Sequence, residues 1–99
     1  MMYDPGALHV ALAAAVGDDP KLVAELRGVF LESAAALVDQ LKRSRCDANW
    51  QMAALRLQGL GASFGAVALM SAADEAAKGA PGDPVIVREI ERAIALFDS

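Results

Sequence analysis

The chain has 99 residues, a formal net charge of −4 and a hydrophobic content of 56%. This length supports one domain with one modest core, so we treat residues 1–99 as a single helical domain. Alanine, leucine and valine dominate the apolar residues without strand-like alternation, which predicts an all-α fold. The acidic balance disfavours nucleic acid and anionic membranes as partners. The single cysteine, Cys46, excludes an intramolecular disulfide and favours a cytoplasmic location.

Three Asp-Pro pairs mark expected helix starts: Asp4-Pro5, Asp19-Pro20 and Asp83-Pro84. In each pair the acid can cap the helix, and proline takes the first helical position, where its missing N–H costs no hydrogen bond. The first predicted helix runs from about Pro5 to Val16 and forms a short lid over the end of the other helices. Leu8 and Leu12 share its apolar stripe with Val16, and His9 lies beside that stripe.

The second predicted helix, from Pro20 to about Arg43, is the longest, roughly 36 Å at 1.5 Å per residue. Its apolar residues recur at intervals of three and four and are expected to face the core: Leu22, Leu26, Val29, Phe30, Leu37 and Leu41. Asp39 and Arg43 are spaced for an i,i+4 ion pair. The turn Ser44–Cys46 is short, so the next helix must return antiparallel, with Asp47 as its expected N-cap.

The third predicted helix ends near Phe64, because Gly65 interrupts its pattern. One side of this helix is expected to form core: Trp50, Ala53, Ala54, Leu57, Leu60, Gly61 and Phe64. The opposite side is small and polar except for Met52 and Leu55: Gln51, Met52, Leu55, Gln58, Gly59, Ala62 and Ser63. An internal glycine costs about 1 kcal/mol relative to alanine. Gly61 therefore predicts a close contact between helices, and Gly59 predicts the close approach of a partner.

Two more helices are predicted after Gly65. The fourth runs from about Ala66 to Lys78-Gly79, with these residues inward: Val67, Met70, Ala73 and Ala77. Ala80-Pro81-Gly82 forms a loop. The last helix runs from Pro84 to about Phe97 and presents to the core Ile86, Ile90, Ala93, Ile94 and Phe97. The expected architecture is an antiparallel up-down-up-down four-helix bundle with a short extra N-terminal helix.

No set of residues in the sequence indicates catalysis or metal binding. One histidine and one cysteine in distant segments do not make a metal site. The adjacent acids Asp74 and Glu75 point about 100° apart on a helix, so they diverge. Nucleophilic catalysis by a serine needs a nearby base, and the only histidine, His9, is distant along the chain from the serines. We therefore expect that the protein is not an enzyme and that it holds no metal and no cofactor.

The run Ala53–Ala66, AALRLQGLGASFGA, resembles the signature of histidine-containing phosphotransfer (HPt) domains of bacterial phosphorelays. That signature reads approximately A-H-x-L-K-G-S-A-x-x-[LF]-G-A. The matching residues are Ala54, Leu57, Gly59, Phe64, Gly65 and Ala66. Leu55 stands at the histidine position and Gln58 at the lysine position, while the usual small pair is replaced by Leu60 and Gly61. Helix lengths and turn positions extend the resemblance over nearly the whole chain, which implies an HPt-like fold.

In this family an exposed histidine receives a phosphoryl group from a receiver domain, beside a lysine one turn later. Leu55 has no nucleophilic atom, Gln58 has no charge, and Arg56 lies about 100° around the helix from Leu55. The resemblance therefore implies a pseudo-phosphotransfer protein of two-component signalling, which binds a response-regulator receiver domain or a histidine kinase without phosphotransfer. The expected partner-binding residues are Gln51, Met52, Leu55, Arg56, Gln58, Gly59 and Ala62.

Three other interpretations remain open. A structural helical bundle could self-associate, as a weak homodimer, through Met52 and Leu55 without any phosphorelay partner. A phosphotransfer protein could instead use His9 as its acceptor, although the small residues that would admit a receiver are missing there. Leu55 is also compatible with simple drift in a domain that has lost its activity, because single exposed apolar side chains are common.

Overall fold

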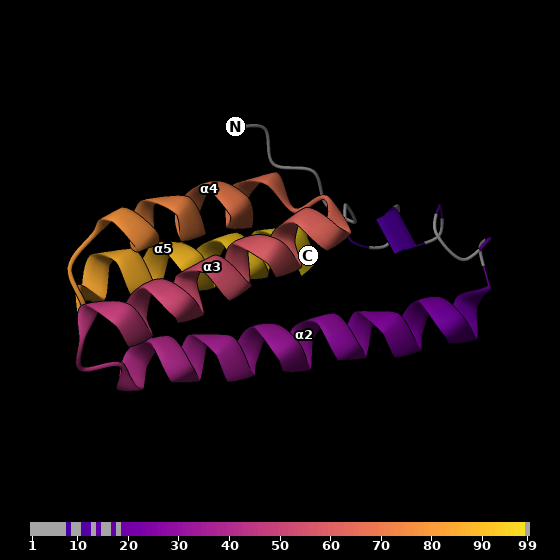
Figure 1. Cartoon of the computed structure of the whole chain (residues 1–99). Helices are drawn as coiled ribbons and strands as arrows, with labels where there is room; N and C mark the ends of the chain where they lie inside the picture. Colours follow the sequence, from indigo (N-terminus) through magenta and orange to yellow (C-terminus); the bar gives the residue numbers. More distant parts are fainter. Residues whose placement is uncertain (1–7, 9–10, 13, 15–16, 18, 99) are drawn as a thin grey trace.

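The computed structural model describes Leu8, Ala11, Leu12, Ala14, Gly17 and residues 19–98. Four helices contain most of these residues (Figure 1): α2 (Pro20–Arg43), α3 (Asp47–Phe64), α4 (Val67–Lys78) and α5 (Pro84–Asp98). No strand occurs among the described residues, which confirms the predicted all-α class. In the predicted first helix, Leu8, Ala11, Leu12 and Ala14 are helical. The rest of that helix, with His9, Val16 and the Asp4-Pro5 pair, lies outside the described residues.

The two described Asp-Pro pairs cap helices as predicted. The Asp19 carboxylate accepts a hydrogen bond from the backbone N–H of Lys21 at 3.0 Å, at the start of α2. The Asp83 carboxylate accepts one from the N–H of Val85 at 2.9 Å, at the start of α5. Each bond satisfies a backbone donor that has no partner within the helix.

α3 ends where the sequence predicts, because Gly65 adopts a left-handed backbone with φ of 69°. The N–H of Gly65 donates to the carbonyl of Ala62 at 3.3 Å, and the N–H of Ala66 donates to the carbonyl of Gly61 at 2.8 Å. This pair of bonds is a Schellman motif, which closes a helix while satisfying its last carbonyls. It reverses the chain into α4 within two residues.

The predicted N-cap of α3 is wrong by one residue. Cys46 holds the cap position with an extended backbone, and its side chain makes no capping hydrogen bond. Asp47 is the first helical residue instead. Its carboxylate lies in the first turn, where a negative charge complements the positive end of the helix dipole.

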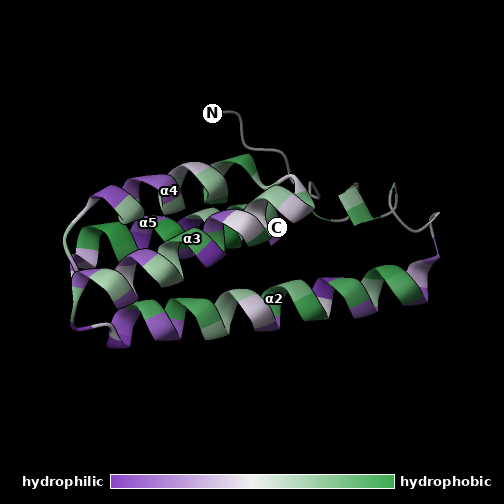
Figure 2. Ribbon diagram, viewed as in Figure 1, coloured by the Kyte–Doolittle hydropathy of each residue, from purple (hydrophilic) through white to green (hydrophobic). Residues whose placement is uncertain are grey.

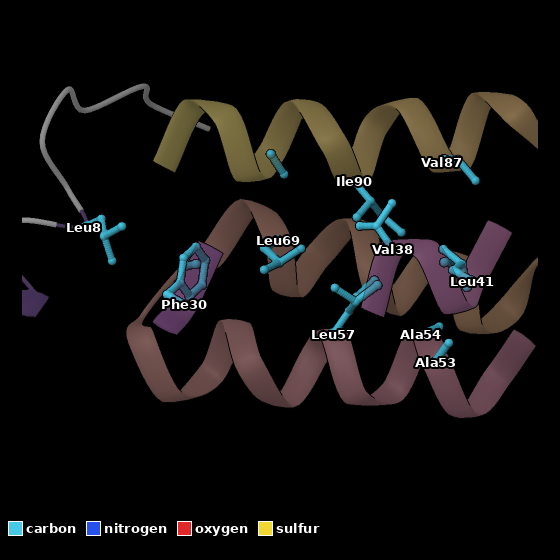
Figure 3. Packing of buried hydrophobic residues seen from close by; sticks show 14 of the residues in the cluster. Leu8, Phe30, Val38, Leu41, Ala53, Ala54, Leu57, Leu69, Val87 and Ile90 are labelled. Carbon is cyan, nitrogen blue, oxygen red and sulfur yellow. The ribbon is translucent and has the colours of Figure 1, made fainter. Parts of the chain in front are cut away.

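One hydrophobic cluster joins the four helices and the N-terminal leucines. Leu8 and Leu12 are buried, as their predicted stripe requires, and Figure 3 shows Leu8 at the same end of the cluster as Phe30. The ring of Phe30 contacts the ring of Phe64 at a centroid distance of 4.8 Å and that of Phe97 at 5.5 Å. These aromatic contacts connect α2 to the ends of α3 and α5.

The predicted core faces of α3 and α5 are confirmed, with some members only partly buried. On α3 the fully buried residues are Trp50, Ala53, Ala54, Leu57 and Gly61, with Leu60 and Phe64 partly buried. On α5 the buried residues are Val87, Ile90 and Ala93, and the partly buried ones are Ile86, Ile94 and Phe97.

The predicted core faces of α2 and α4 need correction. Leu22 and Val29 are exposed, and the core residues of α2 are Val23, Phe30, Ala34, Val38 and Leu41. Val29 and Phe30 are neighbours in sequence and point about 100° apart, so both cannot face the centre of the core. Val67 is also exposed, and α4 buries Leu69, Ala73 and Ala76, with Met70 and Ala77 partly buried. In both helices, packing against neighbours selects one of several apolar faces.

α3 contacts α2 and α4, and α5 contacts the same two helices. The guanidinium of Arg27 ties α2 to the end of α5: Nε donates to the Asp98 carboxylate at 2.7 Å, and a second nitrogen donates to the Asp98 carbonyl at 2.7 Å. Lys42 pairs with Glu91 at 3.0 Å farther along. The predicted pair of Asp39 and Arg43 forms at 2.9 Å. Pairs as exposed as these contribute about 0–1 kcal/mol each.

Gly61 permits the close contact between α3 and α4 that its position predicts. A Cβ atom at Gly61 would lie 3.0 Å from Cγ of Met70, 3.2 Å from the backbone nitrogen of Met70 and 3.3 Å from the carbonyl oxygen of Ala66. Two of these atoms belong to the backbone and cannot move away as a side chain can. A glycine is therefore favoured where α3 passes the start of α4, since a Cβ would force these neighbours to shift.

Substitution of two leucines of α3 tests the orientation of this helix. Leu57 is completely buried, so Leu57→Ala should lower the free energy of unfolding by about 2–5 kcal/mol. Leu55 is exposed, so Leu55→Ala should change it by only about 0.5 kcal/mol. Urea unfolding followed by circular dichroism measures both values, and equal losses would mean that the orientation of α3 is wrong.

Alanine substitution at the two glycines of α3 distinguishes Gly61, which packs closely against α4, from Gly59, which has no packing neighbour. A Cβ at Gly59 meets nothing within 4 Å, so Gly59→Ala should stabilise the protein by about 1 kcal/mol. Gly61→Ala improves helix propensity by the same amount, but its Cβ is crowded against Met70 and Ala66. Overpacking of this kind typically lowers the free energy of unfolding by about 1–3 kcal/mol, which offsets the gain. In urea unfolding, Gly61→Ala should be no more stable than the parent protein. Equal stabilisation by both variants would contradict the close contact at Gly61.

Candidate docking surface on α3

The predicted partner-binding residues all lie on α3, on its side away from the core. We call them the Leu55 surface: Gln51, Met52, Leu55, Arg56, Gln58, Gly59 and Ala62. Six of the seven are exposed, and Gln58 is half-buried. The structure therefore brings the predicted residues together on one helix, with Gln58 nearer the neighbouring helix than predicted.

Met52 and Leu55 form the apolar centre of this surface. Met52 is 52% exposed and Leu55 is 57% exposed. Residues three apart are neighbours on a helix surface, so the two side chains lie side by side. Each leaves more than half of a large apolar side chain in water, in the middle of a helix whose other face is tightly packed.

Gly59 leaves the surface flat one turn beyond Leu55. No atom of the described chain lies within 4 Å of a Cβ built at Gly59. Its φ is not in the left-handed range either, so neither packing nor backbone conformation requires a glycine here. The Ser63 hydroxyl donates a hydrogen bond to the Gly59 carbonyl at 3.0 Å, so this carbonyl accepts a side-chain hydrogen bond from within α3. The exposed backbone at Gly59 offers close approach to a partner.

Polar side chains border the Leu55 surface on the side toward α4. The amide nitrogen of Gln51 donates to the carbonyl of Ala77 at 3.4 Å, across the gap between α3 and α4. Gln58 lies two turns farther along the same side of α3, which accounts for its partial burial. On α3 itself the side chains of this edge are uncharged, while on α4 the residue after Ala77, Lys78, pairs with Asp74.

A hollow borders the Leu55 surface on the side toward α2. Its volume is about 270 Å³, and it is lined by Gln40, Arg43, Ser44, Asn49, Met52 and Ala53. Met52 belongs to both features, so the hollow and the Leu55 surface are continuous. The sequence analysis missed Gln40, Ser44 and Asn49, because a hollow between two helices depends on how those helices pack.

No group of three or more histidine, cysteine, aspartate or glutamate side chains in the described residues could hold a metal ion. Cys46 is exposed at the start of α3. Asp74 accepts a hydrogen bond from Lys78 at 3.0 Å, and this bond raises the pKa of the Lys78 ammonium. His9, considered above as an alternative acceptor, lies outside the described residues.

Among residues that the structure describes, no helix combines the length and the apolar character needed to cross a bilayer.

Comparison with known proteins gives no match. No protein-family model fits the sequence, no curated protein matches it, and no solved structure matches the chain. A function is therefore inferred from the geometry of the Leu55 surface and from the resemblance of the run Ala53–Ala66 to the HPt signature.

Proposed function

We propose that this protein is a non-catalytic, HPt-like module of two-component signalling. It binds a receiver domain, or the corresponding domain of a histidine kinase, through the Leu55 surface. The observation that carries the proposal is an exposed leucine in the middle of α3, one turn before a glycine that the fold does not require. These two residues stand where the HPt motif has its phosphoacceptor histidine and the glycine after its lysine.

An up-down-up-down bundle is part of the proposal. The contacts between helices are cyclic, from α2 to α3, α4, α5 and back to α2. Trp50, in the first turn of α3, donates its indole N–H to the carbonyl of Ala76 near the end of α4, at 2.6 Å. Arg27, near the start of α2, contacts Asp98 at the end of α5. Both contacts join the beginning of one helix to the end of its neighbour, as antiparallel packing requires.

Binding without transfer follows from the side chains at the docking surface. Leu55 has no lone pair with which to attack a phosphoryl group, and Gln58 cannot balance the negative charge of one. The apolar centre formed by Met52 and Leu55 can still be buried by a partner. Removing apolar surface from water contributes about 25 cal/mol per Å², so such a surface favours association. The protein would then occupy a receiver or kinase domain and compete with its phosphotransfer partner.

Restoring the missing chemistry tests this proposal. In the double variant Leu55→His, Gln58→Lys, an imidazole occupies the exposed mid-helix position, with an ammonium one turn away. A half-buried lysine at position 58 can extend its charged end to solvent along its aliphatic stem. The double variant should label when mixed with a phosphorylated receiver domain, the single Leu55→His variant should label more slowly, and the parent protein should not label at all.

Val29→His provides a matched control for the labelling experiment. Val29 is 54% exposed on α2, almost the same as Leu55, and lies on a different helix. A labelled Val29→His variant would show that any exposed histidine accepts phosphate, and so would remove the support for a specific docking surface. A folded double variant that no receiver labels would favour the self-associating bundle. Labelling of the parent protein would direct attention to His9.

A further inference from the structure

The partner of the Leu55 surface can be described further from the charges around it. The whole chain carries a formal charge of −4. Between positions 39 and 59 it has four basic residues, Lys42, Arg43, Arg45 and Arg56, and two acidic ones, Asp39 and Asp47. This stretch therefore carries +2, and the rest of the chain carries −6. Lys42 pairs with Glu91 of α5, so the stretch together with this ion-pair partner carries +1. The region around the Leu55 surface is therefore slightly basic in an acidic protein.

The arginines of this region are available to a partner. Arg45 and Arg56 are exposed, and neither forms an ion pair with any residue that the structure describes. Arg43 pairs only with Asp39, one turn away on its own helix, and its side chain is 71% exposed. An exposed i,i+4 pair is worth about 0.3–0.5 kcal/mol, so a partner carboxylate can replace Asp39 at little cost.

The hollow beside Met52 extends the surface toward these cations. Arg43 lines the hollow, and the uncharged polar side chains of Gln40, Ser44 and Asn49 line it as well. Figure 2 shows the end of α2 and the turn into α3 as hydrophilic, in contrast to the apolar patches along the rest of α2. A volume of about 270 Å³ accommodates one side chain of a partner. The lining offers hydrogen-bond donors and one exchangeable positive charge to that side chain.

Arg56 completes the charged edge. It follows Met52 by four residues, so the two lie one turn apart on the same side of α3. The sequence of features across α3 is therefore an uncharged polar edge toward α4, an apolar centre at Leu55 and Met52, and a cationic edge toward α2.

We propose that the Leu55 surface binds a protein partner with an apolar centre and an acidic edge, and that an acidic side chain of this partner enters the hollow to meet Arg43. This inference rests on the proposed function, because it names the chemistry of the partner at the same surface. Charge complementarity of this kind contributes mainly to specificity and to the rate of association. The net charge of the chain predicts the opposite preference, for a basic partner.

Two synthetic helical peptides test the inference directly. Both carry the same stripe of leucines, and one has glutamates along both edges of the stripe while the other has lysines. The glutamate peptide should bind about tenfold more tightly by fluorescence anisotropy at low salt, and added salt should reduce the difference. In the variant Arg43→Glu, Arg56→Glu, this preference should be reversed. The double variant Arg88→Glu, Arg92→Glu, an equal change of charge on the exposed face of α5, should leave it unchanged.

The possible results distinguish this inference from the proposed function. Equal binding of the two peptides, tighter binding of the lysine peptide or binding of neither would overturn the acidic-edge partner. So would self-association of the protein alone that Leu55→Asp abolishes, because a second copy would then cover the surface. The proposed function fails separately, if no receiver or kinase domain binds while the glutamate peptide still does.

Discussion

The indole N–H of Trp50 donates to the carbonyl of Ala76 at 2.6 Å, and this buried hydrogen bond joins the first turn of α3 to the end of α4. Toward the far end of the same helix, the backbone of Gly61 lies so close to Met70 and Ala66 that an added Cβ would be crowded. This hydrogen bond and this close backbone contact hold α3 in the same rotation about its axis as the burial of Leu57 does. In that rotation six residues of the Leu55 surface are exposed, and Gln58 is half-buried.

The surface that results combines features that neither stability nor folding explains. Two large apolar side chains stand more than half in water, and a helix-destabilising glycine lies one turn beyond them. Isolated exposed leucines are common, but the combination with an open glycine and an adjoining hollow is typical of a surface that another molecule covers. The basic edge formed by Arg43 and Arg56 then gives that molecule a chemical character. Leu55 itself has no nucleophilic atom, and the function that we propose for this face is recognition.

The sequence predicted α3 well because its two faces differ strongly in size. Trp50 and Leu57 leave one possible core side, and Gly65 supplies an unambiguous end. On α2 the adjacent apolar residues Val29 and Phe30 offered two possible core faces, and only packing selects Phe30. The hollow beside Met52 could not be predicted, because it depends on the spacing of α2 and α3. The location of the candidate surface was thus predictable, while the hollow that brings Arg43 beside Met52 became visible only in three dimensions.

Amide chemical shifts give the most direct test of the central claim that a receiver or kinase domain docks on the outer side of α3. Isotope-labelled protein would be titrated with unlabelled receiver domains and with a histidine-kinase phosphotransfer domain, and the shifted amides mapped onto the fold. The account predicts saturable shifts concentrated between Asn49 and Ser63, with the backbone amide of Gly59 among the largest. Saturable shifts centred on α5, with α3 unaffected, would contradict it.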